Sequence, residues 1–173
     1  SFLSGQGALP QRQAGLNTVR ILVPRSEIRT ETGREISRLA DLYGNGEIAF
    51  TSRQNVAIRH VPDASVPLLT EALHKAGCAT EGFERAPDIV ACVGTTQCKM
   101  AVSDTRQSCF TLRDELSADK DYWNRIGPLR IHFTGCPNNC AHAWSADIGL
   151  RGRRRRGDTG NVEGYSIFIG GKL

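Results

Sequence analysis

The sequence predicts an α+β fold built in two parts. Residues 1–77 alternate between short apolar runs with strand character and longer patterns with helical spacing, in the order β-α-β-α. A polar loop at 78–88 then separates this small α/β unit from a second segment that mixes one long helix with several strands. We therefore expect one domain over residues 1–80 and a second over residues 81–173.

The first expected strand and helix lie in residues 18–46. Residues 18–24, TVRILVP, are rich in β-branched side chains and end at a proline, which is typical of a strand. The following residues carry apolar side chains three and four positions apart, as an amphipathic helix does. Gly44 and Gly46 are expected to end this helix.

The second strand and helix are expected in residues 47–77. Residues 47–62, EIAFTSRQNVAIRHVP, alternate apolar with polar side chains, which predicts one strand with an apolar face and a polar, basic face. Residues 63–77 have the pattern of a second helix. Asp63 is a candidate cap at its start, and Gly77 is a candidate stop signal.

The second part begins with the apolar run IVACV at 89–93 and continues into a helix expected from about Cys98 to Leu116. Three further runs have strand character: PLRIHFTG at 128–135, ADIGLRG at 146–152 and GYSIFIGG at 164–171. An α+β arrangement accounts for this mixture of elements.

Composition limits the classes of partner. The chain has 22 Lys and Arg against 18 Asp and Glu, and much of the excess lies in LRGRRRRGDTG at 150–160. We interpret this run as a solvated turn that an acidic protein or an anionic ligand could approach. No nucleic-acid motif accompanies it, so nucleic acid is not an expected partner. No segment has the length and apolarity of a membrane span or a signal peptide, which favours a cytoplasmic protein.

Six cysteines divide into two kinds. Cys78 and Cys109 stand alone in apolar or helical contexts and are expected to be buried free thiols. The other four form two pairs that carry the functional argument. The first pair has five residues between its members and the second has three. The pairs are Cys92 with Cys98, and Cys136 with Cys140.

Both pairs are expected where a strand ends and a helix begins, because backbone N–H groups there favour thiolate over thiol. Structural zinc fits the three-residue gap but not the five-residue gap. Four thiolates at wider spacing suit a [4Fe–4S] cluster. The spacing leaves three interpretations open: a [4Fe–4S] cluster, a zinc ion, or structural or disulfide-bonded cysteines.

The wider sequence resembles the sirohaem-dependent nitrite and sulfite reductases. The stretches ACVGTTQCKMAVSDT, IHFTGCPNNCAHAWSADIGLRG and GYSIFIGGKL are similar to the iron–sulfur module of that family. Upstream, LPQRQAGLNTVRILVP and GNGEIAFTSRQNVAIRHVPD are similar to its ferredoxin-like half domain. The resemblance covers nearly the whole chain. It implies a ferredoxin-like α/β half domain followed by an α+β module that binds sirohaem and a [4Fe–4S] cluster.

The resemblance also implies roles for single residues. The four paired cysteines match the cluster ligands, and Cys140 matches the thiolate that also bonds the sirohaem iron. Asn138 matches a residue near the sirohaem, although it can equally be a turn former with a left-handed backbone. A basic strand of the family reaches the haem carboxylates, and the residues here that match it are Thr51, Arg53 and Gln54. Lys99, next to Cys98, is a further candidate for a carboxylate contact.

The activity implied is the six-electron reduction of nitrite to ammonia, with the cofactors performing the redox chemistry. Reduction of sulfite to sulfide is the alternative. CVGTTQCKMAVSDT and SADIGL are more similar to the nitrite branch, since the sulfite branch more often has Glu in place of Asp147. A non-catalytic iron–sulfur subunit for electron transfer is a second alternative.

Two kinds of protein partner are expected from the resemblance. The chain has no flavin or nicotinamide motif, so a ferredoxin or a flavoprotein would supply the electrons. Family enzymes contain two copies of the half domain and module, and this chain contains one. A second half domain, another subunit or a homodimer mate is therefore expected to complete the site.

Overall fold

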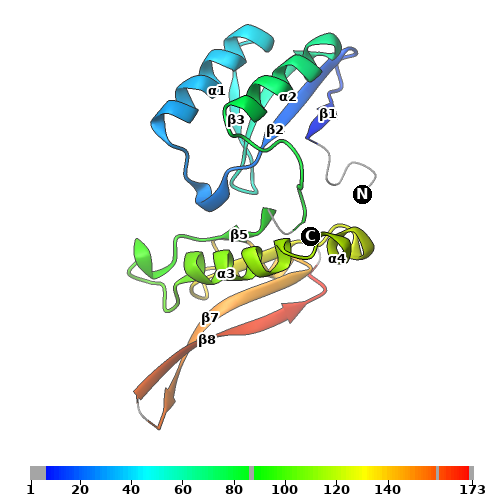
Figure 1. The fold of residues 1–173 in the computed structure, drawn as a ribbon. Helices are drawn as coiled ribbons and strands as arrows, with labels where there is room; N and C mark the ends of the chain where they lie inside the picture. Colours follow the sequence, from blue (N-terminus) through cyan, green and yellow to red (C-terminus); the bar gives the residue numbers. More distant parts are fainter. Residues whose placement is uncertain (1–6, 86–87, 159, 172–173) are drawn as a thin grey trace. The chain divides into compact units, whose positions relative to one another are not determined.

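The computed structural model describes residues 7–85, 88–158 and 160–171 (Figure 1). The chain divides into two compact units, Ser1–Phe83 and Glu84–Leu173. Each unit combines helices with a four-stranded sheet, which confirms the predicted α+β class. No helix among the described residues is long and apolar enough to span a membrane.

The first unit is an antiparallel sheet with the strand order β1-β2-β4-β3. Both of its helices lie on the same face of that sheet (Figure 1). The element order is β1 (Ala8–Pro10), β2 (Leu16–Ile21), α1 (Thr30–Tyr43), β3 (Ile48–Phe50), β4 (Val56–Pro62) and α2 (Val66–Lys75). The unit is therefore ββαββα rather than the β-α-β-α expected from the sequence.

The core of the first unit forms between these helices and the sheet. Helix α1 buries Ile36, Leu39 and Ala40, and helix α2 buries Leu69 and Leu73. Their three- and four-residue spacing places the apolar side chains of each helix on one face. Each large side chain buried in this way stabilises the fold by about 1.5–3 kcal/mol. The sheet contributes Val19, Ile21, Val56, Ile58 and Val61 to the same cluster.

Residues 47–62 form a hairpin, so the prediction of one continuous strand is wrong. The Thr51 N–H donates to the Asn55 carbonyl at 2.9 Å, and the Gln54 N–H donates to the Thr51 carbonyl at 3.0 Å. Gln54 has a φ of 60°, a left-handed conformation that lets the chain reverse without a glycine. Of the residues predicted for the polar strand face, Thr51, Arg53 and Asn55 therefore lie between β3 and β4, and Arg59 lies in β4.

Asp63 does not cap helix α2 through its side chain. The helix begins at Val66, after a short 3-10 turn at Asp63–Ser65, and has no side-chain cap. The Asp63 carboxylate instead accepts a hydrogen bond from the Asn17 side chain at 2.7 Å. Gly77, with a φ of 77°, lies just beyond the end of α2, as predicted.

The second unit has a sheet with the order β5-β6-β7-β8. The first three strands are parallel, and β8 returns antiparallel to β7. Helix α3 lies against the sheet, and the β7–β8 hairpin extends beyond the rest of the unit (Figure 1). The elements are β5 (Val90–Ala91), α3 (Thr105–Ser117), α4 (Lys120–Ile126), β6 (Ile131–Thr134), β7 (Ile148–Gly157) and β8 (Gly160–Ile169).

Two sequence expectations for this unit are wrong. Helix α3 begins at Thr105 rather than near Cys98, because the Asp104 carboxylate caps it by accepting the Gln107 N–H at 3.0 Å. The arginine run at 150–160 is not a turn: its arginines lie in strand β7. Helix α4 has no counterpart among the elements expected from the sequence.

Cys78 and Cys109 are buried free thiols, as expected. Cys78 belongs to the core of the first unit, and Cys109 packs with Ile131 and Phe133 in the second. Burial raises the pKa of the Cys109 thiol to about 11, because a thiolate would lose its hydration there. Both thiols are therefore inert parts of the packing.

Candidate metal centre

The two cysteine pairs follow neighbouring parallel strands. Val90 and Ala91 of β5 pair with His132 and Phe133 of β6. Cys92 comes directly after β5, and Cys136 comes two residues after β6. Because the carboxyl ends of parallel strands lie at the same edge of a sheet, both cysteine loops begin there. The fold thus brings together segments that are far apart in the sequence.

A hydrogen bond to sulfur joins the two loops. The Gly135 N–H, one residue before Cys136, donates to the Cys92 Sγ at 3.1 Å. The Thr105 hydroxyl donates to the Cys92 carbonyl at 2.7 Å and lies 3.5 Å from the same sulfur. Hydrogen bonds to ligand sulfurs stabilise negative charge on them, and they are one means by which proteins tune cluster potentials.

Glycine at 135 permits this close approach. A Cβ atom added to Gly135 would lie 2.9 Å from the Ala101 Cβ and 3.5 Å from the Cys92 Sγ. The first of these distances is too short for two carbon atoms without a shift of the backbone. The Val102 N–H also donates to the Gly135 carbonyl at 2.9 Å, so residue 135 is bonded to the first loop on both sides.

The four paired cysteines are all free thiols, but they differ in exposure. Cys136 is buried, Cys92 and Cys98 are half-buried, and Cys140 is exposed. Nowhere in residues 7–85, 88–158 and 160–171 do three His, Cys, Asp or Glu side chains gather closely enough to hold a single metal ion. The structure therefore brings the two loops together without gathering their sulfurs around one point. Four unpaired thiols on adjoining loops are a donor set that fits an iron–sulfur cluster.

The predicted junctions with α-helices are absent from these loops. Cys92 is followed by a 3-10 turn at Gly94–Thr96. The Cys136 loop leads through turns into a second short 3-10 element at Ala143–Ser145. Single amides such as that of Gly135 therefore face the sulfur, in place of the helix N-terminus that the sequence suggested.

Asn139 shapes the second loop, a role that sequence reasoning did not assign to it. Its φ is 55°, and its side-chain oxygen accepts the Ala143 N–H at 2.7 Å. The left-handed position proposed for Asn138 thus belongs to Asn139, whereas Asn138 is exposed. Asparagine is favoured at such positions because its short polar side chain bonds to nearby backbone. The NN dipeptide was the available signal, but it did not show which residue adopts the left-handed conformation.

Two further side chains fix the ends of the strands around this loop. Buried His132 lies with its Nδ1 2.8 Å from the Ala141 carbonyl, which ties the residue after Cys140 back to β6. The Asp147 carboxylate accepts three hydrogen bonds from Arg130, including Arg130 N–H at 2.7 Å and Nη2 at 3.0 Å. These bonds to Arg130 hold the pKa of Asp147 below its usual value.

The remaining predicted site residues are exposed or lie in the other unit. Lys99 is exposed beside Cys98. Thr51 and Gln54 help to build the β3–β4 turn: the Thr51 hydroxyl accepts the Asn55 N–H at 3.1 Å, and the Gln54 side chain accepts the Ser26 hydroxyl at 3.0 Å. Arg53 is half-exposed in the same turn. None of the three lies on a strand face.

Two family models match the chain. The nitrite/sulfite reductase ferredoxin-like half domain matches residues 9–76. The nitrite and sulphite reductase 4Fe-4S domain matches residues 85–173, more than half of the chain. The chain belongs to the nitrite/sulfite reductase family. The cofactors of this family are a [4Fe–4S] cluster and a sirohaem, and the cysteine loops described above fall within the matched 4Fe-4S domain.

Members of the nitrite/sulfite reductase family resemble the chain over almost all of its length. A ferredoxin–nitrite reductase of Synechococcus elongatus is 41% identical over 167 residues, which are 96% of this chain and 32% of that protein. The chloroplastic ferredoxin–nitrite reductase of Spinacia oleracea is 33% identical over 96% of this chain and 28% of its own length. A ferredoxin sulfite reductase of Mycolicibacterium paratuberculosis is 32% identical over 92% of this chain. The chain spans about a third of the length of these relatives.

Solved structures of the family share the fold. The Mycobacterium tuberculosis NirA protein superposes with a TM-score of 0.83 at 29% identity, covering 97% of this chain and 31% of that one. A dissimilatory sulfite reductase I matches with a TM-score of 0.63 at 21% identity, which is a likeness of fold alone. The architecture of both units is thus that of the nitrite/sulfite reductase family.

Proposed function

We propose that this chain supplies the iron–sulfur and sirohaem-binding part of an enzyme that reduces nitrite to ammonia. The balanced reaction consumes six electrons and eight protons per nitrite and releases one ammonium ion and two water molecules. The observation that carries the proposal is the hydrogen bond from Gly135 to the Cys92 sulfur, because it joins the two cysteine loops at one edge of the sheet.

In this proposal the four thiolates of Cys92, Cys98, Cys136 and Cys140 hold a [4Fe–4S] cluster, and the Cys140 sulfur also bonds the sirohaem iron. The exposure of Cys140 supports its assignment, because a sulfur shared with a second cofactor must be accessible from outside the loop. The cluster and the haem supply one-electron redox chemistry. The chain itself positions the sulfurs and donates hydrogen bonds to them.

The polar residues predicted to contact the sirohaem remain part of the proposal. Lys99 and Asn138 are exposed beside the cysteine loops, where they can reach a bound macrocycle. Thr51, Arg53 and Gln54 would meet the haem carboxylates from the β3–β4 turn. The family matches over residues 9–76 and 85–173 support a half domain at 1–80 and a cofactor module at 81–173.

Nitrite is favoured over sulfite by the relatives at higher identity, which are named nitrite reductases. The Mycolicibacterium relative, named a sulfite reductase, is the observation that keeps sulfite as the second candidate. The names also support ferredoxin as the electron donor. A second half domain, subunit or homodimer mate would complete the site, and we propose a cytoplasmic location, although several relatives are chloroplastic.

The test is an anaerobic absorption spectrum of the protein, with extraction of the chromophore and determination of iron and acid-labile sulfide. Five irons, one of them in extractable sirohaem, and four sulfides are the expected result, followed by faster turnover of nitrite than of sulfite with a reduced dye. Cluster without sirohaem would mean that a second half is needed to hold the haem. A colourless protein that retains zinc would refute the proposal.

A further inference from the structure

A row of three arginines lies on one face of the β7–β8 hairpin. Because side chains alternate along a strand, Arg151, Arg153 and Arg155 point to the same side of β7, about 7 Å apart along the strand. Arg154 and Arg156 point to the other side. We call the first three the arginine row.

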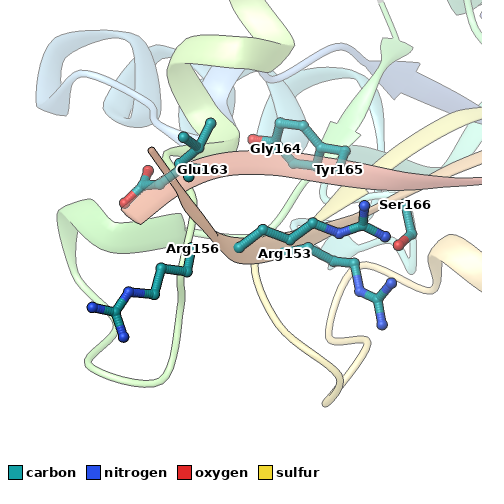
Figure 2. A pocket seen from close by; sticks show the side chains of 9 residues that line it. Arg153, Arg156, Glu163, Gly164, Tyr165 and Ser166 are labelled. Atoms are coloured by element: carbon teal, nitrogen blue, oxygen red, sulfur yellow. The ribbon is translucent and has the colours of Figure 1, made fainter. Parts of the chain in front are cut away.

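Small residues face the arginine row across the hairpin. The residues that pair with Arg151, Arg153 and Arg155 are Ser166, Gly164 and Val162, respectively. A Cβ atom added to Gly164 would have no neighbour within 4 Å. A shallow hollow of about 490 Å³ lies at this end of the hairpin. Its lining includes Arg153, Arg155, Gly164 and Ser166, together with Arg156 and Glu163 from the other set of alternating positions. Figure 2 shows the side chains that line this hollow, among them Arg153, Arg156, Glu163 and Ser166.

Within the described part of β7 and β8, no carboxylate occupies a position on the face of the arginine row. Glu163 pairs with Arg154 at 3.0 Å, and both belong to the opposite face. In β7 and β8, as far as the structure describes them, every position on the face of the row is Gly, Arg, Val, Ser or Phe. Adjacent guanidinium groups without a carboxylate create a positive potential that attracts an anionic surface.

The arginine row begins beside the cysteine loops. Thr134, the last residue of β6, pairs with Arg151 of β7. Strand β7 runs parallel to β6, so Arg153 and Arg155 continue past the edge of the sheet from which the Cys136 loop leaves. A Cβ atom added to Gly149, which lies on the same face as the row, would collide with the Ala143 carbonyl, so the segment that follows Cys140 lies against this face.

We propose that Arg151, Arg153 and Arg155 form the docking surface for an acidic electron-carrier protein. The proposal rests on the proposed function, because it assigns a place to the electron donor of that reaction. A carrier whose carboxylates meet the row would deliver its electrons close to the segment that holds the second cysteine pair. Charge pairs at the rim of such an interface mainly raise the rate of association and make binding depend on salt concentration.

The face fits an acidic protein better than a nucleic acid. Single-stranded nucleic acids bind through aromatic platforms on which bases stack. Phe168 is the aromatic residue of this face within β8, and the Arg151 guanidinium already covers its ring at 5.1 Å from the centroid. No free aromatic ring is therefore available here for base stacking, whereas guanidinium groups form strong hydrogen bonds with the carboxylates of an acidic protein.

The test compares two double variants of the holoprotein that lose the same charge from the same strand. R153Q/R155Q removes the outer arginines of the row, and R154Q/R156Q removes those of the opposite face. Binding of an acidic ferredoxin is measured by titration calorimetry at several salt concentrations. We expect R153Q/R155Q to weaken binding roughly tenfold with a shallower salt dependence, and R154Q/R156Q to change it less than about twofold.

Equal losses in both variants, or no loss in either, would overturn the assignment of this face. Tighter binding of a single-stranded oligonucleotide than of ferredoxin, lost in R153Q/R155Q alone, would overturn the choice of partner. Nitrite turnover with a reduced dye is measured on the same samples and does not need the docking surface. A wild-type protein that binds ferredoxin through the row but holds neither sirohaem nor a [4Fe–4S] cluster would refute the proposed function and leave the docking surface standing.

Discussion

The backbone amide of Gly135 donates a hydrogen bond to the sulfur of Cys92 across 3.1 Å. The two residues are 43 positions apart in the chain, and the contact depends on the parallel pairing of β5 with β6. A four-thiolate site requires both loops to lie at one edge of the sheet. This single bond therefore links the sheet topology to the chemistry that the cysteines can perform.

Replacement of Gly135 by alanine should separate the loops. The new Cβ would meet the Ala101 Cβ at 2.9 Å, so the backbone must shift and the bond to the Cys92 sulfur must lengthen. We expect a loss of about 1–3 kcal/mol in the free energy of unfolding and a lower iron content. Gly164→Ala is the control, because nothing lies within 4 Å of its added Cβ. Similar losses in both variants would contradict the steric argument.

Cys98→Ser should abolish the cluster, whereas Cys109→Ala should retain it. Cys98 is a half-buried free thiol in the first loop, and Cys109 is buried against Ile131 and Phe133. We expect Cys109→Ala to cost about 1–2 kcal/mol of stability through lost packing while iron and sulfide content stay at the wild-type level. Iron analysis and chemical denaturation of both variants measure the two effects separately. Full iron content in Cys98→Ser would remove this residue from the ligand set.

In the metal-free protein, exposed cysteines should react with an alkylating reagent faster than buried ones. Cys140 is exposed, whereas burial raises the pKa of Cys109 to about 11. At pH 8 only about one in a thousand Cys109 side chains would be thiolate, the reactive form. We expect iodoacetamide to label Cys140 rapidly and Cys109 only after denaturation, as followed by mass spectrometry of peptides. Labelling of Cys109 at the rate of Cys140 would show that the core of the second unit opens readily.

Stability should depend on pH through the Arg130–Asp147 pair. Hydrogen bonds from Arg130 lower the pKa of Asp147 in the folded state. Because the pKa is lower in the folded state, the ion pair stabilises the fold fully at pH values above the unfolded pKa of about 3.9. This stabilisation is lost as the pH falls through the folded pKa. The two side chains are 31% and 38% exposed, so solvent screening limits the contribution to about 1 kcal/mol or less.

Asp147→Asn should therefore reduce the free energy of unfolding at pH 7 and leave it unchanged near pH 2. Urea denaturation at a series of pH values measures this difference. Asp158→Asn, at an exposed position near the hairpin turn, removes the same formal charge and serves as the control. A deficit in Asp147→Asn that persists undiminished at pH 2 would point to packing rather than to the ionised carboxylate.

The sequence could predict the helices of the first unit and the pairing of the cysteines, because apolar spacing and a short motif are local signals. It could not predict the β3–β4 turn, since the apolar and polar residues keep alternating through 47–62 and the turn contains neither glycine nor proline. Gln54 takes the left-handed conformation instead. The expected helix began too early because residues 98–104, which have a helical pattern, are held in a loop, in part by the bond from the Val102 N–H to the distant Gly135 carbonyl.

The adjacent residues Asn138 and Asn139 should respond differently to substitution. Asn139 combines a φ of 55° with a hydrogen bond from the Ala143 N–H at 2.7 Å, and Asn138 is exposed. Asn139→Ala loses the hydrogen bond and strains the backbone, which should lower the free energy of unfolding by about 1–3 kcal/mol. Asn139→Gly relieves the strain alone, so its loss should be smaller. Asn138→Ala should change stability by less than about 0.5 kcal/mol.

Chemical denaturation of the three asparagine variants measures these differences, and sirohaem content gives a second readout. If Asn138 contacts the macrocycle, Asn138→Ala should retain wild-type stability but bind less sirohaem. Asn139→Ala should lose iron and sirohaem together, because the loop that carries Cys136 and Cys140 no longer holds its shape. Equal stability of Asn138→Ala and Asn139→Ala would mean that the left-handed residue does not fix the loop, and the geometry of the second cysteine pair would then have to depend on bound metal.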